Sequence, residues 1–299
     1  MRGLAEYIMR GSKQATLVVA VTAAIPLLFW FSAAALALVI LRRGLRDALS
    51  VLVWGTLPAL AWALIGDLTP LLVILGSAGL ATLLRQRGEW SAVLLAAVPL
   101  GVVFALVLLA VLSEPLHALA GQIREMLPEM LSGMNGAVDE VGMARLETLL
   151  VPVLAGLMGA VHVTMALVSL MIGRSWQARL YNPGGFRQEF HQVRLSPLVA
   201  ISLLLVTVLG PQWSQLALVS PVASVPLLIA GLALMHGVIG IKNMGTVWLV
   251  AMYVVFVFMA QFVYPLIMFL AFVDSMFDFR ARMKPGTGSS GDGDSSSQG

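Results

Sequence analysis

Eight uninterrupted apolar runs, each 17 to 28 residues long, dominate the pattern of this chain. They span residues 15–41, 48–66, 68–84, 91–112, 148–172, 198–219, 222–241 and 246–273. Because a helix of about 20 predominantly apolar residues crosses the hydrocarbon core of a bilayer, these runs predict membrane-spanning helices. The predicted fold class is therefore an all-α, polytopic transmembrane helical bundle.

The basic residues decide between two topologies. Eight single crossings put eight Lys and Arg residues on one face of the membrane and ten on the other. If the first and last runs each double back, 16 of the 18 share one face, and only Arg124 and Arg145 lie opposite. Since short cytoplasmic loops are enriched in Lys and Arg, we predict six clear spans, a helical hairpin or re-entrant pair at each end, and both termini in the cytoplasm.

The length of the first and last runs supports this topology. Each has 27 or 28 residues, which is about 40 Å of helix against a hydrocarbon core of about 30 Å. Pro26 and Pro265 lie inside these runs, where a missing backbone donor can break a helix. Arms of about 12 residues reach only about 18 Å, so full crossing and re-entry both stay open.

The segments between and after the runs complete the domain organisation. Residues 1–283 are expected to form one membrane domain, and 284–299, composed mainly of Gly, Ser and Asp, a disordered cytoplasmic tail. Residues 173–197 are predicted to be a cytoplasmic loop.

The segment 113–147 is the only long one predicted outside the cytoplasm. Its pattern indicates one or two amphipathic helices, interrupted near Pro128 and again at residues 133–136. A methionine stripe at spacing four runs along it, made of Met126, Met130 and Met134. The segment is either an interfacial helix on the leaflet or a lid over an outward-facing cavity.

Composition narrows the class of protein further. Hydrophobic residues make up 59% of the chain and charged residues 11%, which is typical of a membrane domain. The formal charge of +3 is spread in small groups beside apolar runs, so it indicates topology and no nucleic-acid partner. The absence of cysteine excludes disulfides, iron–sulfur clusters, Cys-ligated zinc and thiol catalysis.

No enzyme signature occurs in the sequence. A hydrolase elbow, a Walker loop, an HExxH pair and a GxGxxG unit after a strand are all missing. We therefore predict a protein that is not an enzyme, with no catalytic residue, no cofactor and no metal site.

Polar residues inside apolar runs are candidates for function, because they are costly in a bilayer. His162 is interpreted either as bonded to a neighbouring helix or as a ligand contact or proton relay. His236 lies near the cytoplasmic end of the seventh run, where a structural role is favoured. Gln261 precedes Pro265 by four residues and would satisfy backbone groups freed by a break there.

A basic and aromatic segment within 173–197 is the first of two specific cytoplasmic candidates. Its candidate residues are Trp176, Tyr181, Asn182, Pro183, Gly184 and Phe186. Aromatic residues beside arginines are typical of interface anchors, so the segment is a hypothetical docking site for a cytoplasmic protein. The alternative is a loop that only orients the chain in the membrane.

The second candidate segment closes the membrane domain. It contains Asp274, Asp278 and Arg280, and spacing four would put Asp274, Asp278 and Arg282 on one helical face. The plainer interpretation is a helix leaving the membrane with a local ion pair.

These motifs carry a resemblance to a known family. The Tyr181–Phe186 loop, the Arg42-Arg43-Gly44 turn and the closing Asp274, Asp278-Phe279-Arg280 resemble the YybS-like family of bacterial integral membrane proteins, over residues 10–283. That family is distantly similar to the substrate-capture components of energy-coupling-factor vitamin transporters and to the cell-shape membrane protein MreD. The resemblance implies no established substrate or catalytic residue. This chain has more apolar runs than a minimal six-helix capture component.

The expected location is the bacterial cytoplasmic membrane, and the leading function is binding or transport of a small molecule through a cavity between helices. The alternative is a non-catalytic scaffold for envelope or division machinery. An intramembrane enzyme acting on lipid has the least support, since acid/base pairs are missing from the apolar runs. A cavity lined by His162 and Gln261 would favour transport, and a solidly packed bundle would favour the scaffold.

Overall fold

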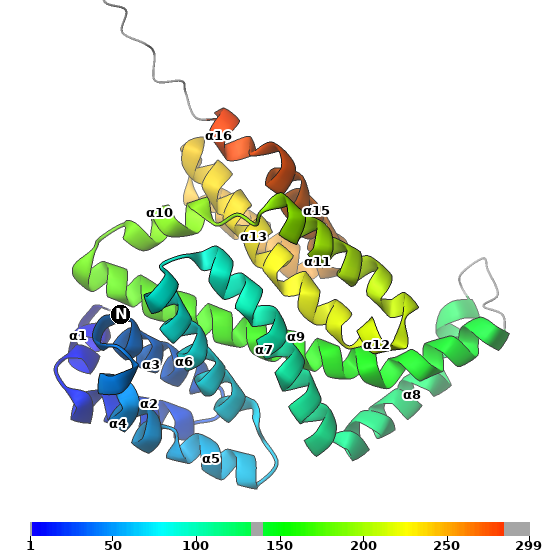
Figure 1. Cartoon of the computed structure of the whole chain (residues 1–299), viewed down its shortest axis with the longest axis horizontal. Helices are drawn as coiled ribbons and strands as arrows, with labels where there is room; N and C mark the ends of the chain where they lie inside the picture. The colour runs from blue at the N-terminus through cyan, green and yellow to red at the C-terminus, as the bar shows by residue number, and fades with distance from the viewer. Residues whose placement is uncertain (1, 133–139, 284–299) are drawn as a thin grey trace, which may run out of the picture.

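The computed structural model describes residues 2–132 and 140–283, and every regular element in these two ranges is a helix (Figure 1). The all-α prediction is therefore confirmed for this part of the chain. The expected tail, 284–299, and the interruption at 133–136 lie outside the described residues.

The helices follow the order of the apolar runs. Their bounds are α1 Arg2–Met9, α2 Ser12–Ala24, α3 Phe29–Arg43, α4 Leu45–Gly55, α5 Leu57–Leu64, α6 Thr69–Arg87, α7 Trp90–Val111, α8 Ser113–Ser132, α9 Glu140–Tyr181, α10 Gly185–Gln192, α11 Pro197–Leu209, the 3-10 helix η1 Gly210–Gln212, α12 Ser214–Ala217, α13 Val219–Ile241, α14 Thr246–Phe258, α15 Ala260–Phe277 and α16 Phe279–Met283.

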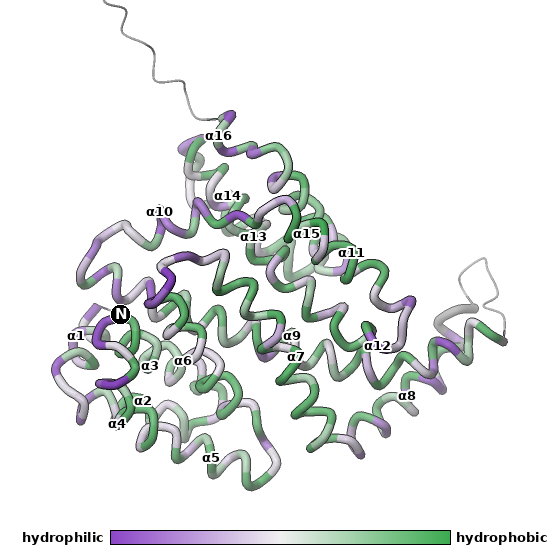
Figure 2. Tube along the Cα trace, in the orientation of Figure 1, coloured by the Kyte–Doolittle hydropathy of each residue, from purple (hydrophilic) through white to green (hydrophobic). Residues whose placement is uncertain are grey.

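Five helices in the described ranges, α6, α7, α9, α13 and α15, are long and apolar enough to cross a membrane. The bent pairs α4–α5 (46°) and α10–α11 (69°) raise the number to seven if each counts as one span. Figure 2 shows hydrophobic residues along α7 and α13, and hydrophilic residues at α8, α10 and α16. By length and composition, the chain is a multi-pass membrane protein.

The first apolar run doubles back on itself. Leu27 has a φ of 66° and separates α2 from α3, with Pro26 at the break as predicted. Ser32 Oγ donates to Val19 O at 2.8 Å near this turn, and Arg43 Nη2 donates to Met9 O at 2.6 Å at the far end. The start of α2 therefore lies beside the end of α3, as the hairpin prediction requires.

The last apolar run also turns back, but at a different residue. The break is Met259, whereas Pro265 lies inside the continuous helix α15, so the predicted break at Pro265 is wrong. Proline there removes only one helical hydrogen bond near the N-terminus, which a transmembrane helix tolerates. Tyr253 of α14 bonds His236, and Tyr264 of α15 bonds Ser224. Helix α14 thus runs back along α13, and α15 then runs parallel to α13.

Other boundaries differ from the sequence-based expectations. The 48–66 run bends at Thr56, and the 198–219 run ends its first helix at Leu209, before Gly210 and Pro211. These two predicted spans are therefore broken helices. The predicted interruption near Pro128 is wrong, since α8 continues to Ser132.

The predicted cytoplasmic loop 173–197 is largely helical. Helix α9 extends to Tyr181 and α10 follows after a short turn, so only the residues between these helices and after α10 are irregular. The last turns of α9 pack against the rest of the bundle, which is why the helix continues past the end of its apolar run.

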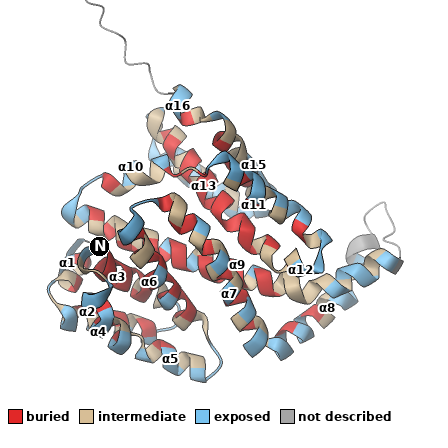
Figure 3. Cartoon of the chain, viewed as in Figure 1, coloured by how far each residue is buried: buried red, intermediate tan, exposed pale blue. Residues whose placement is uncertain are grey.

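Helix α9 is the centre of the packing, and glycines let its neighbours approach closely. It lies between α3, α6 and α7 and the α13 side of the molecule, and Figure 3 shows buried residues along it. A Cβ atom at Gly159 would lie closer than 3.0 Å to Gly101 O, and one at Gly173 closer than 3.0 Å to Ala34 O. These glycines bring α7 and α3 against α9, as small residues do in membrane bundles.

We expect Gly159→Ala to lower the stability of the protein in detergent by about 1–3 kcal/mol, because the added methyl group must displace the α7 backbone. Gly79→Ala is the matched control, since Gly79 is an exposed position on α6 with nothing within 4 Å of its Cβ direction. Thermal unfolding followed by circular dichroism measures both. Equal midpoints for the two variants would contradict the close packing of α7 and α9.

Candidate functional site

Contacts gather the basic groups at one end of the bundle, here called the basic end. Arg85 Nη1 donates to Leu41 O at 2.5 Å, and the Arg42 guanidinium lies 4.1 Å from the centre of the Tyr181 ring. With the bond from Arg43 to Met9, these contacts join the ends of α1, α3, α6 and α9. The described members are Arg2, Arg10, Lys13, Arg42, Arg43, Arg46, Arg85, Arg87, Arg174, Arg179, Arg187, Arg194, Lys242, Arg280 and Arg282.

The two basic residues expected on the other face, Arg124 and Arg145, lie at the opposite end of the bundle. Arg124 pairs with Glu147 at 2.8 Å, and Arg145 Nη2 donates to Gln212 O at 2.5 Å. Glu147 precedes Tyr181 by 34 residues in the same continuous helix, which is about 50 Å. The charge partition read from the sequence therefore matches the two ends of the bundle.

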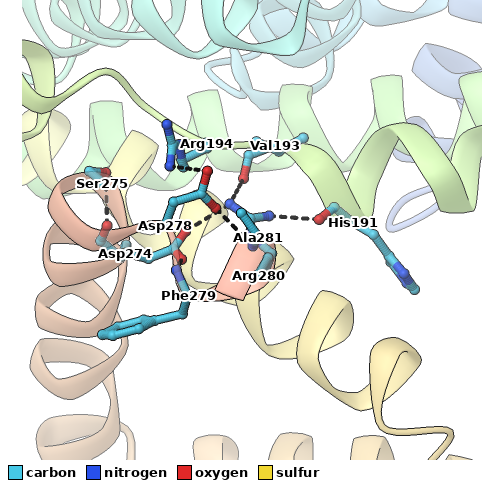
Figure 4. Close-up of polar contacts among 10 residues, drawn as sticks. His191, Val193, Arg194, Asp274, Ser275, Asp278, Phe279, Arg280 and Ala281 are labelled. Carbon is cyan, nitrogen blue, oxygen red and sulfur yellow. Dashed lines mark hydrogen bonds and ion pairs between the residues drawn. The ribbon is translucent and has the colours of Figure 1, made fainter. Parts of the chain in front are cut away.

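A buried arginine fastens the last helices to the α10–α11 connection. The Arg280 guanidinium donates to His191 O at 2.7 Å, to Val193 O at 2.9 Å and to Asp274 Oδ2 at 2.8 Å (Figure 4). Both charged side chains are almost fully buried. Their charges neutralise each other, and the two carbonyls accept two further N–H groups of the guanidinium, which favours a stable buried ion pair.

The local sequence explains this geometry. Asp278 adopts φ 47° and ends α15, so the chain turns and Arg280 points back at Asp274. Asp274 Oδ1 accepts from Phe279 N at 3.0 Å, and Asp278 Oδ1 accepts from Ala281 N at 3.2 Å, which caps the short α16. The expected shared helical face of Asp274, Asp278 and Arg282 is wrong, because the helix stops at Asp278.

Asp278 instead pairs with a residue distant in sequence. Its Oδ2 lies 2.6 Å from Arg194 Nη1, and this pair is partly exposed. Arg282 lies over the Phe277 ring at 5.9 Å. Asp274, Asp278 and Arg280, all singled out from the sequence, thus lie in one cluster, but their partners are backbone atoms and Arg194.

A pocket of about 750 Å³, here called the basic pocket, opens beside this cluster between α10, α13 and α16. It is lined by Gly184, Arg187, Gln188, His191, Gln192, Arg194, Gly237, Gly240, Ile241, Asp278, Arg280 and Ala281. The sequence pattern did not single out the pocket residues of α10. The only sequence signal for them is the spacing of four between Arg187 and His191, which puts both on one helical face. That signal is weak beside the aromatic residues of the same segment.

The basic pocket carries a positive field. Burial lowers the pKa of the His191 imidazole below its ordinary value, and the positive charges of Arg187 and Arg280 lower it further. The ring is therefore neutral at pH 7 and keeps one nitrogen as an acceptor and one as a donor.

The aromatic residues of the hypothetical docking segment mostly face inward. Trp176 is 3% exposed and packs near Phe31, and Phe186 stacks against Phe190 and lies near Trp90. Trp176 is thus unavailable as a surface anchor, because it packs inside the bundle. Tyr181 remains 45% exposed.

The turn after Tyr181 contains the remaining candidates of this segment. Asn182, Pro183 and Gly184 are exposed, and Gly184 has φ 86°, a conformation that favours glycine. Asn182 O accepts from Gly185 N at 3.0 Å. The turn thereby directs α10 across the basic end.

The intramembrane candidates do not meet at one site. His162 is 6% exposed, with Nδ1 2.7 Å from Met158 O and Nε2 3.3 Å from Thr69 Oγ1 of α6. His236 Nε2 lies 2.8 Å from Tyr253 Oη, and the histidine packs edge-on to Phe190. Gln261 is exposed at the start of α15. His162 and His236 therefore each bridge to another helix.

A second pocket, here called the lateral pocket, lies between α9, α11, α13 and α15 and has a volume of about 560 Å³. Its lining is largely apolar and consists of Leu157, Ala160, Val161, Thr164, Met165, Thr207, Ser220, Pro221, Ser224, Val225, Leu228, Tyr264 and Met268. Neither His162 nor Gln261 lines it. The lateral pocket is therefore not the cavity that His162 and Gln261 were expected to line.

No protein-family model, curated protein or solved structure matches this chain. Among the described residues, no group of three or more His, Cys, Asp or Glu side chains could hold a metal ion.

We expect Arg280→Lys and Asp274→Asn to destabilise the protein by about 3–5 kcal/mol each, because each leaves buried charge or carbonyl groups without a partner. Arg194→Lys is the control, since its pair with Asp278 is partly exposed and should change stability by less than about 1 kcal/mol. Thermal unfolding in detergent gives the comparison. A midpoint for Arg280→Lys equal to that of Arg194→Lys would show that the buried cluster does not stabilise the fold.

Proposed function

We propose that this chain is a multi-pass protein of a bacterial cytoplasmic membrane that binds a small, mainly apolar molecule with one hydrogen-bonding group in the lateral pocket. The pocket size falls in the range of small-molecule sites, and its walls combine many apolar side chains with a few polar groups.

The observation that carries this proposal is the state of the Thr207 hydroxyl. Thr207 Oγ1 is buried and has no hydrogen-bond partner in the described part of the chain. Thr164, which also lines the pocket, instead donates to Ala160 O at 2.7 Å, the usual bond of a helical threonine. A buried hydroxyl without a partner is costly, so a ligand group that displaces the atoms covering it and bonds it would recover that free energy.

Ser169 Oγ is the other buried side-chain oxygen without a partner among the described residues. The Ser169 side chain of α9 is fully buried by the helix packing, whereas Thr207 lines a pocket. The pocket is what distinguishes the threonine as a candidate for ligand contact.

A hydrogen-bonded pair on the α13–α15 wall adds a polar group of defined character. Ser224 Oγ donates to Pro221 O at 2.6 Å, so its single hydrogen is used. Tyr264 Oη, 2.5 Å from Ser224 Oγ, is then the donor of their shared bond. The tyrosine oxygen keeps its acceptor capacity, which suits a ligand hydroxyl or amide N–H.

Entry from the side of the bundle is consistent with the residues at the rim. Leu157, Val161 and Met165 of α9 line the pocket and are also exposed. In a bilayer these positions would contact acyl chains. An apolar ligand would therefore reach the pocket through the lipid and leave its polar group at Thr207 or Tyr264.

A long-chain alcohol tests this proposal, with the alkane of equal length as the reference ligand. We expect saturable binding of the alcohol to the purified full chain, and a loss of about 3–10-fold in its affinity for Thr207→Val and for Tyr264→Phe. Thr164→Val should bind like the parent protein, because the hydroxyl that it removes is already bonded. Native mass spectrometry in detergent measures the affinities.

Equal binding of alcohol and alkane by all four proteins would contradict a role for the polar groups. No saturable binding of either probe would overturn the proposal and favour the non-catalytic scaffold.

We further propose that the basic end faces the cytoplasm, so that both termini lie on that side, since positively charged loops are retained there. Because the chain has no cysteine, single introduced thiols report topology without background. We expect Ser12→Cys and Asp47→Cys to react only with a permeant reagent, and Ser214→Cys to react with an impermeant reagent added outside the cell. Asp47 is exposed at the start of α4 and is a better labelling site than the neighbouring Gly44, because the φ of 93° at Gly44 disfavours a side chain. Labelling of Ser12→Cys from outside would reverse the orientation.

A further inference from the structure

We infer that the basic pocket binds a phosphate group, either a free phosphate ion or the phosphate of an anionic lipid headgroup. This inference is independent of the lateral pocket, which involves the opposite end of α13. It rests on the charges, the arrangement and the position of the residues that line the basic pocket.

The charges around the pocket do not balance. Arg194 is paired with Asp278, and Arg280 is paired with Asp274. Arg187 has no carboxylate partner among the described residues. Three guanidinium groups thus face two carboxylates, and the excess positive charge lies on the most accessible of the three. An anion in the pocket would supply the missing charge.

The position of Arg187 and His191 focuses this charge on one wall. The two residues are four apart in α10 and therefore lie on the same face of that helix. A Cβ atom at Gly240 would lie 2.6 Å from His191 Cε1 and 3.6 Å from Arg187 Nη2. Both side chains therefore flank the same point of α13.

The glycines of α13 keep this wall free of side chains. Gly237 and Gly240 both line the pocket, and a Cβ atom at Gly237 would lie 3.0 Å from both Arg280 Cδ and His191 O. A side chain at Gly240 would collide with the His191 ring, because that ring lies against the α13 backbone there. The two glycines therefore let His191 and Arg280 pack directly against α13, which holds one wall of the pocket in place.

The different roles of Arg280 and Arg187 favour phosphate recognition. Arg280 is held by two backbone carbonyls and Asp274, and Figure 4 shows its guanidinium enclosed by those groups while the His191 ring points away from it. Arg280 therefore supports the wall, and Arg187 is free to bind. A guanidinium binds phosphate oxygens through two parallel N–H donors, and the neutral His191 ring can add a third.

The location of the pocket is consistent with either source of phosphate. It opens at the end of α13, beside Lys242 and the other basic groups. Basic pockets between membrane helices at the level of the headgroups bind anionic lipids. The same pocket is open to solvent-borne phosphate, because Arg187 and Gln188 are exposed.

The test measures binding of two probes to the purified full chain. Inorganic phosphate is titrated by calorimetry in detergent, and phosphatidylglycerol is compared with phosphatidylcholine in nanodiscs by native mass spectrometry. We expect saturable binding of at least one anionic probe, with affinity reduced about tenfold or more in Arg187→Gln and partly restored in Arg187→Lys. The control is Arg46→Gln, which removes one exposed positive charge from the same end but outside the pocket.

Each outcome decides the inference. Binding of phosphate alone assigns the site to a free anion, and binding of phosphatidylglycerol alone assigns it to a lipid headgroup. An equal loss in Arg46→Gln would show that only the general charge of the basic end matters and would overturn the site. Absence of saturable binding of both probes would overturn it as well.

Discussion

The need of every buried polar group for an internal partner organises this molecule, because a bilayer offers none. Helices satisfy their own backbone, and hydroxyl groups such as those of Thr82 and Ser275 bond to the carbonyl four residues earlier. The same requirement explains His162, which is bonded on both ring nitrogens, and Arg280, which is surrounded by acceptors. Thr207 departs from the rule and lies at a pocket wall. Ser169 departs from it as well but lies fully buried in the helix packing, so the missing partner and the pocket together mark Thr207 as a functional candidate.

The buried Arg280–Asp274 cluster also connects the two candidate segments of the basic end, which are residues 173–197 and the end of α15 with α16. Through His191 O and Val193 O it fixes the connection between α10 and α11, and thereby the position of α10 against α13. These bonds hold the end of α10, where His191 lies against Gly240. One buried ion pair therefore supports a wall of a pocket in which Arg280 itself already makes three hydrogen bonds to protein groups.

Helix α13 takes part in both pockets, and its small residues serve different purposes along its length. Ser220 and Ser224 line the lateral pocket, whereas Gly237 and Gly240 line the basic pocket. Between them, Gly231 allows the backbone of α15 to approach closely. All three glycines thus permit close approach to α13, whereas the short side chains of Ser220 and Ser224 line the lateral pocket.

The sequence alone determined the fold class, the membrane setting, the doubling back of the first and last runs and the grouping of basic residues, because these depend on hydrophobic length and on charge counted along the chain. It also marked Asp274, Asp278 and Arg280, since charged residues beside an apolar run are conspicuous. It misplaced the last break at Pro265, because proline is tolerated early in α15, and it treated Asp278 as helical, because a single φ of 47° leaves no trace in the spacing. Only the tertiary structure decided that Trp176 is buried, that Arg194 is the partner of Asp278, and that Arg187 faces Gly240. Those facts arise from contacts between segments 53 to 145 residues apart in the sequence. Such contacts are set by packing in three dimensions, which the periodicity of the chain does not encode.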